Sequence, residues 1–114
     1  MIRRKEEAEV IVAENVAGGN AKIYKNMMVN ASEMLGMGRM VARVVLPSGS
    51  SIGEHAHVDD AELYYILKGE ATVTDNDKTE ILHAGDAVFT GGGARHSIAN
   101  MTDEDVEFLA VIIE

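Results

Sequence analysis

Residues 49–69 read GSSIGEHAHVDDAELYYILKG and have the pattern of two short β-strands joined by a turn. The central VDDA favours the turn, because short acidic side chains are common there. His55 and His57 are two residues apart, so on a strand both imidazoles point to the same side. If the turn closes a hairpin, Glu62 lies directly opposite His57 on the next strand.

The rest of the chain continues this pattern of short strand-like runs separated by residues that favour turns. We expect nine strands, at Ala21–Val29, Arg39–Leu46, Ser51–His57, Glu62–Leu67, Glu70–Thr74, Thr79–Leu82, Ala87–Thr90, His96–Asn100 and Val106–Ile113. No long amphipathic helix interrupts them, and only Ser32–Leu35 has weak helical character. This spacing predicts an all-β fold, either a sandwich or a barrel.

A chain of 114 residues is long enough for one hydrophobic core and therefore for one domain. We expect residues 1–20 to form an N-terminal arm that can add a strand to a dimer, and residues 21–114 to form the barrel. The last strand, Val106–Ile113, is almost uniformly apolar, so both of its faces should be covered. A partner subunit in a homodimer would cover the second face of this strand. The alternative explanation of its apolar composition is that the strand lies in the interior of a sheet.

The composition excludes several classes of protein. Ten basic and nineteen acidic residues give a net charge of −9, which repels phosphate backbones and argues against nucleic acid as a partner. The chain has no cysteine, which excludes disulfides and thiolate nucleophiles. Its longest apolar run, Phe108–Ile113, is too short to cross a bilayer. We expect no membrane partner and a soluble, cytoplasmic protein.

The histidines give the clearest sign of chemistry. If Glu62 lies beside His57, its carboxylate and the imidazoles are close enough to ligate one ion. His96, which follows a glycine triplet on a distant strand, can supply a fourth ligand. Three nitrogens and one oxygen suit manganese, iron, nickel, cobalt or zinc, so we expect one divalent transition metal ion per chain. An octahedral ion held by these four ligands would have two open coordination positions for water, dioxygen or a chelating substrate.

Two longer motifs contain these residues. The pattern Gly49-x5-His55-x-His57-x4-Glu62-x6-Gly69 resembles the first signature motif of the cupin family, and Gly85-x5-Gly91-x-Gly93-x2-His96-x3-Asn100 resembles the second. The resemblance implies a double-stranded β-helix (jelly-roll) barrel that holds a metal inside, with His55, His57, Glu62 and His96 as ligands. The second motif usually has proline at the position of Gly91, so we expect a more mobile loop before His96.

Alternation along the strands places further side chains near this site. Tyr64 follows Glu62 by two residues and should face inward, either to donate a proton or a hydrogen bond to a substrate or to pack in the barrel. We expect Ile66, Ile98 and Phe89 to complete an apolar cavity wall.

Other polar residues are expected at the surface or in turns. Arg43 and Arg95 are candidates for binding an anion at the barrel mouth, and otherwise they are surface charges. Asp59 and Asp60 are expected to form the turn after His57. His83 lies outside both motifs and is expected at the surface.

These features predict a metal-dependent enzyme that acts on a small molecule. The resemblance first implies oxygen-dependent oxidation, as in a dioxygenase, with Glu62 and Tyr64 as catalytic candidates. A sugar or sugar-phosphate isomerase is the second option, and it would need Arg43 or Arg95 at the barrel mouth. A module that binds metal and a small molecule without turnover, and a metal-free barrel with structural histidines, are the alternatives outside enzyme chemistry.

Overall fold

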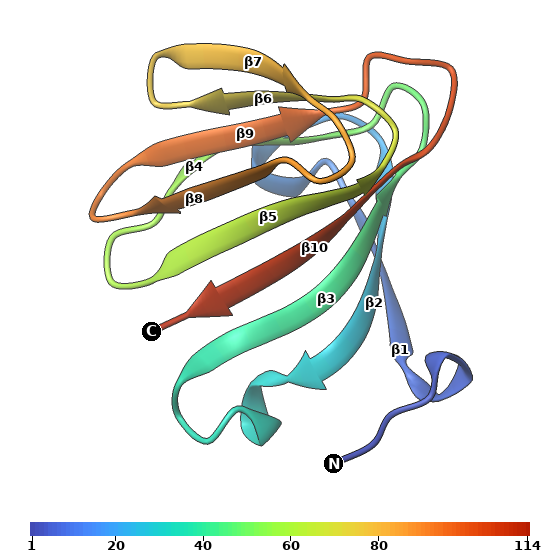
Figure 1. The fold of residues 1–114 in the computed structure, drawn as a ribbon, viewed down its shortest axis with the longest axis vertical. Coiled ribbons are helices and arrows are strands. Elements are labelled where there is room, and N and C mark those ends of the chain that lie inside the picture. Colours follow the sequence, from blue (N-terminus) through green and yellow to red (C-terminus); the bar gives the residue numbers. More distant parts are fainter.

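The computed structural model describes residues 1–114 as ten strands and three short 3-10 helices (Figure 1). The strands are β1 (Glu9–Glu14), β2 (Lys22–Asn30), β3 (Gly38–Leu46), β4 (Ser51–Ala56), β5 (Ala61–Lys68), β6 (Ala71–Asp75), β7 (Lys78–Leu82), β8 (Ala87–Gly91), β9 (Arg95–Ala99) and β10 (Val106–Ile113). The 3-10 helices are η1 (Lys5–Glu7), η2 (Val16–Gly18) and η3 (Ala31–Glu33). None of the helices has the length and apolar character needed to cross a membrane.

Two antiparallel sheets face each other and form a jelly-roll barrel. One sheet has six strands in the order β1-β2-β3-β10-β5-β8, and the other has four in the order β4-β9-β6-β7. All nine predicted strands are present with small changes at their ends, so the predicted all-β barrel is confirmed. The weak helical signal near Ser32 corresponds to the single turn η3.

The core lies between the two sheets, where every second residue of a strand points inward. Fourteen buried apolar residues form it, with Val44, Ile66 and Phe108 from the six-stranded sheet and Ile52 and Ile98 from the four-stranded sheet. These residues hold the strands that carry the histidines at a fixed distance from β5, which carries Glu62.

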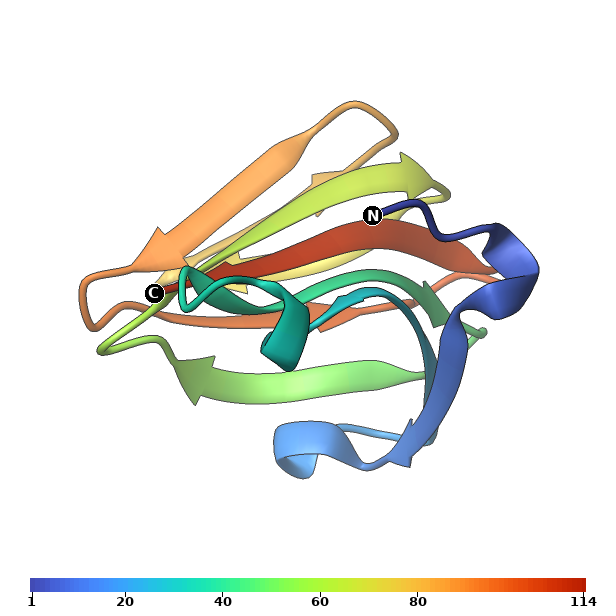
Figure 2. The same ribbon diagram turned by 90° about the horizontal axis from the view of Figure 1, so that it is seen from below.

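The N-terminal residues are joined closely to the barrel. β1 pairs with β2 of the same chain from Glu9↔Met27 to Glu14↔Lys22. The helix η2 then packs against β4, as seen at the lower edge of Figure 2. Gly53 of β4 permits this contact, because a Cβ there would lie 2.1 Å from the carbonyl oxygen of Ala17. That residues 1–20 also add a strand to a dimer stays a prediction.

The last strand, β10, lies in the interior of the six-stranded sheet, between β3 and β5. Its inward residues Val106, Phe108 and Ala110 are buried, whereas the outward Leu109 and Val111 are only half-buried. The chain itself therefore covers one face of β10. The second cover predicted for this strand would have to come from outside the chain.

Candidate metal centre

The four predicted ligands come from three strands and one connecting segment. His55 lies near the end of β4 and His96 lies directly opposite it on β9. His57 follows the end of β4, and Glu62 projects from β5 of the opposite sheet. The structure thus brings together side chains that are up to 41 residues apart in the sequence.

The predicted hairpin between His57 and Glu62 is wrong. β4 belongs to the four-stranded sheet and β5 to the six-stranded sheet, so the residues between them cross the barrel instead of turning back. His57 is held at the crossing by two backbone hydrogen bonds, one to the carbonyl of Ala94 (3.0 Å) and one from the amide of Gly93 (2.8 Å). Glu62 therefore meets His57 across the barrel and not along a sheet.

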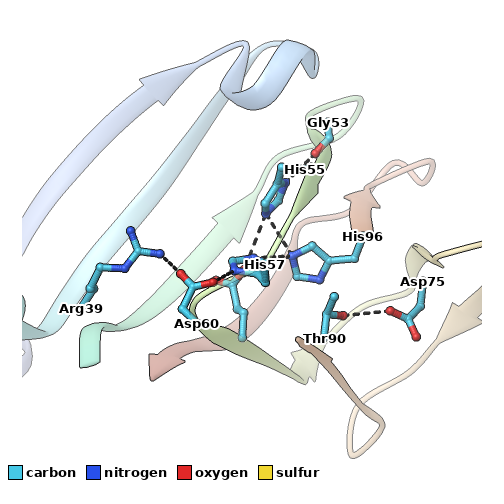
Figure 3. A network of polar contacts seen from close by, with 9 residues as sticks. Arg39, Gly53, His55, His57, Asp60, Asp75, Thr90 and His96 are labelled. Carbon is cyan, nitrogen blue, oxygen red and sulfur yellow. Dashed lines mark hydrogen bonds and ion pairs between the residues drawn. The ribbon is translucent and has the colours of Figure 1, made fainter. Parts of the chain in front are cut away.

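The ligand atoms of the four residues converge on one point. The Nε2 atom of His96 lies 3.0 Å from Nε2 of His55 and 3.1 Å from Nε2 of His57. Oε1 of Glu62 lies 3.0 Å from His57 Nε2, 3.1 Å from His96 Nε2 and 3.7 Å from His55 Nε2. All four atoms lie within 4.8 Å of one another. Figure 3 shows the three imidazoles turned towards one another.

This donor set fits a transition metal ion. Bonds of about 2.1 Å at right angles would separate neighbouring ligand atoms by about 3.0 Å, which is close to the spacing observed. The hydrogen-bond partners at Nδ1 of His55 and His57 also leave the Nε2 lone pairs of these rings available to an ion. Nδ1 of His55 lies 2.8 Å from the carbonyl of Gly53, and Nδ1 of His57 lies 2.8 Å from the carboxylate of Asp60. Both partners only accept hydrogen bonds, so with an ion bound each neutral ring would carry its proton on Nδ1 and turn the Nε2 lone pair towards the ion.

The charges in the cluster are strongly coupled. Burial alone would raise the pKa of Glu62, but contacts with the imidazoles of His55 and His96 lower this pKa to about 2. The Glu62 carboxylate in turn raises the pKa of His55, whereas burial lowers the pKa of His57. An ionised carboxylate among three imidazoles attracts either a proton or a metal cation to their centre.

Tyr64 faces inward, as alternation predicts, and is 1% exposed. Its ring stacks on His96 with the ring centroids 4.6 Å apart, and it meets Phe108 edge to face. Burial, together with the nearby Glu62 carboxylate, raises the pKa of Tyr64 well above its ordinary value. Tyr64 therefore supports His96 sterically and keeps its phenolic proton at neutral pH.

A cavity of about 360 Å³ opens beside the cluster, and His55, His57 and Glu62 line it. Two basic residues, Lys25 of β2 and Arg39 of β3, line the same cavity. Sequence reasoning did not identify either of them. Lys25 was detectable in principle, because it lies in phase with the buried Ile23 and Met27 and breaks an apolar face. Arg39 gives no such signal, because a charged residue at the start of a strand is ordinary.

Arg43 and Arg95 do not line the cavity, which agrees with the expectation that they are surface charges and not with anion binding at the barrel mouth. Arg43 pairs with Glu107, and Arg95 pairs with Glu54. Phe89 does not complete the cavity wall, because it is 61% exposed on the outer face of the six-stranded sheet.

Ile66 and Ile98 were also expected in the cavity wall, and this expectation is wrong, because both are fully buried in the core and neither lines the cavity. His83 is exposed, as expected. Gly91 has a steric reason for being glycine, because a Cβ there would lie 2.8 Å from the Cβ of Ala61. The mobility expected for the loop before His96 stays a prediction.

Comparisons with known proteins agree with this architecture. The Cupin domain family pattern matches residues 42–112. An oxalate-binding protein of Thermotoga maritima is 41% identical over 113 residues, which are 99% of this chain and 93% of the relative.

Solved structures show the same likeness. A Thermotoga maritima structure described as a predicted oxalate decarboxylase is 41% identical, with a TM-score of 0.94 over 99% of this chain and 98% of its own. The structure of KdgF from Halomonas sp. is 15% identical and has a TM-score of 0.78 over 96% of this chain and 91% of its own, so it shares the fold alone. Because the family pattern spans more than half of the chain and a curated relative matches almost all of it, the chain belongs to the cupin family.

Proposed function

We propose that this cupin binds one divalent transition metal ion through His55, His57, Glu62 and His96. The convergence of three imidazoles and one ionised carboxylate supports this proposal. The mixed nitrogen and oxygen set favours manganese, iron, nickel, cobalt or zinc over the oxygen-seeking magnesium and calcium. Such an ion would supply Lewis acidity and a positive charge beside the cavity when bound.

The ligand that we propose for the cavity is a small carboxylate of the oxalate type. The observation that carries this choice is Lys25, which enters the cavity from β2 and forms no ion pair with a carboxylate of the chain. An unpaired ammonium group on an otherwise apolar inner face favours an anionic ligand. The Thermotoga relative, which is named an oxalate-binding protein, supports the choice of oxalate.

The other residues of the cavity would orient this ligand and exclude water. Arg39 adds positive charge, although its guanidinium already contacts Asp60 and Glu114. Lys25 is therefore the cation that is free to bind one end of a dicarboxylate. Apolar side chains such as Phe108 and Ile112 line the remaining wall.

Turnover is a separate question from binding. The dioxygenase-like activity predicted first from the sequence stays a prediction, as do the catalytic roles of Glu62 and Tyr64. Tyr64 keeps its proton at neutral pH and would act only as a donor, whereas the ionised Glu62 would only accept. Oxygen consumption by metal-loaded protein, measured with oxalate and a panel of diols and keto acids, tests for this activity. The isomerase alternative named Arg43 or Arg95, which do not line the cavity, so Lys25 and Arg39 would have to take their place.

The proposed ligand is tested by calorimetric titration of oxalate into manganese-loaded protein. We expect wild-type protein to bind oxalate, and Lys25→Ala to weaken the affinity by about tenfold or more, since a charge-assisted contact is lost. Lys22→Ala, on the same strand but exposed, is the matched control and should bind like the wild type. Equal affinity of the Lys25→Ala and Lys22→Ala proteins would contradict the proposed carboxylate site.

We propose that a second copy of this chain is the protein partner, and that the two copies form a homodimer through the outer face of the six-stranded sheet. Val41, Val111, Leu63 and Phe89 are register neighbours on β3, β10, β5 and β8, and they form an uncharged row across this face. A contiguous apolar surface of this kind is typical of interfaces. Two chains of charge −9 repel each other, so this uncharged row is where copies of this chain can approach closely.

A further inference from the structure

In each of the three histidines of the cluster, Nδ1 points away from the convergence point. The hydrogen-bond partner of this atom differs from one histidine to the next. His55 is held by a backbone carbonyl, that of Gly53. His57 is held by the side chain of Asp60, 2.8 Å from its Nδ1 atom. Nδ1 of His96 is buried and has no hydrogen-bond partner. His57 is thus the one histidine of the three whose outward ring nitrogen is held by another side chain.

We propose that Asp60 is a positioning residue for the metal centre, and that Arg39 holds Asp60 in place. The inference rests on the proposed metal binding by the four residues of the cluster. Asp60 would fix the proton of His57 on Nδ1 and the direction of the ring, which leaves the Nε2 lone pair aimed at the ion. Side chains that hold metal-binding histidines in this way set both ring orientation and basicity.

The contacts of Asp60 are divided between its two carboxylate oxygens. Oδ1 accepts the hydrogen bond from His57, while Oδ2 pairs with the guanidinium of Arg39. Nε of Arg39 also lies 3.0 Å from the carboxylate of Glu114. Figure 3 shows the continuous chain from Arg39 through Asp60 to His57 and onward to the cluster. With both oxygens engaged, the carboxylate has little freedom to rotate away from His57.

From the sequence, Asp60 was assigned to a turn only, as was its neighbour Asp59. In the structure the two residues differ in exposure. Asp59 is exposed, whereas the Asp60 side chain is only 11% exposed and makes its hydrogen bonds to side chains. A residue that served the turn alone would have no need to be buried beside an imidazole. Arg39 and Asp60 also line the cavity, so this chain of contacts connects the cavity wall to the metal site.

Zinc affinity of the purified full chain, measured in competition with a chromophoric chelator at neutral pH, tests the proposal. We expect Asp60→Ala to weaken zinc binding by about 10–100-fold. Asp59→Ala is the matched control, because it removes the same charge from the adjacent residue and leaves His57 untouched. Asp60→Asn keeps an oxygen that accepts from Nδ1, so it should restore part of the affinity, and Arg39→Gln should lose less than Asp60→Ala.

A second measurement separates positioning from a general loss of structure. Imidazole nitrogen chemical shifts of the zinc-loaded protein should show His57 with its proton on Nδ1 in the wild type and in Asp59→Ala, and a changed Nδ1 shift in Asp60→Ala, because the hydrogen bond to the carboxylate is lost. Unchanged His57 shifts, or equal zinc affinity of the Asp60→Ala and Asp59→Ala proteins, would overturn the positioning role. A wild-type protein that binds no zinc would instead overturn the proposed metal site.

Discussion

The two faces of the six-stranded sheet are built from the same strands but have different chemistry. Tyr64 and Tyr65 are adjacent on β5, yet Tyr64 is 1% exposed against His96 and Tyr65 is 40% exposed on the outer face. Lys25 and Arg43 likewise point to opposite faces of their strands. The inner face carries Glu62 and forms one wall of the cavity, facing the three histidines of the other sheet, whereas the outer face carries an uncharged row. The period of two therefore separates a candidate reaction site from a candidate interface within one layer.

The strongest test of this comparison is to remove the two tyrosine rings one at a time. Tyr64→Ala should lower the free energy of unfolding by about 3–5 kcal/mol, because it empties a fully packed site between His96 and Phe108. Tyr65→Ala should cost about 1 kcal/mol or less in a monomer. Denaturant unfolding monitored by circular dichroism measures both. Similar losses for the two variants would mean that the inner and outer faces are not distinguished as described.

The outer face is tested by placing a charge in the middle of its apolar row. We expect wild-type protein to have twice the mass of one chain by light scattering, and Val111→Glu to have the mass of a single chain, because a carboxylate would be buried in the interface. Ile81→Glu places the same charge on the exposed edge strand β7 of the other sheet and should leave the mass unchanged. A wild-type protein with the mass of one chain would contradict the proposed dimer.

We expect the smallest effect on stability from a change away from both faces, at the ion pair between Arg3 and Glu33. The hydrogen bond from Arg3, with a second from the backbone of Asn30, lowers the pKa of Glu33 from its ordinary value of 4.5 to about 2. A lowered carboxyl pKa stabilises the fold above pH 4.5, and this contribution is lost as the pH falls towards 2. The melting temperature of wild-type protein should therefore slightly exceed that of Glu33→Gln at pH 6, and the difference should vanish near pH 2.

Glu6→Gln, a change at an exposed acid in η1, is the control for this pair. It should show no comparable pH dependence relative to the wild type. A melting-temperature difference between wild type and Glu33→Gln that stays constant from pH 6 to pH 2 would mean that this ion pair does not contribute as described.

Much of the fold and the grouping of the four ligands could be predicted from the sequence. Turn residues between short apolar runs marked the strands, and the two gapped motifs placed His96 beside His55 and His57. Alternation correctly turned Tyr64 inward, because Tyr64 lies two residues after Glu62 on β5. The strand positions and the direction of Tyr64 depend on local patterns that a single strand displays by itself, whereas the grouping of His96 with the other ligands depended on the resemblance to the cupin motifs.

The errors share a different cause, which is that alternation does not say to which sheet a strand belongs. Glu62 was placed in a hairpin with His57, whereas the chain crosses between sheets at that point. Phe89 was turned inward, but the polar Thr90 takes the inner position because its hydroxyl donates to Asp75. Asp60 could not be assigned beyond its turn, because its partners His57 and Arg39 come together only in three dimensions.

The central claim is that the interior of the barrel holds a metal ion on four converging side chains from both sheets. The most direct measurement is elemental analysis of untagged protein after loading with manganese or zinc and extensive dialysis. We predict one metal ion per chain in the wild type and none in a folded His55→Ala/Glu62→Gln double variant. Wild-type protein that retains no metal, or a double variant that retains as much as the wild type, would contradict the account.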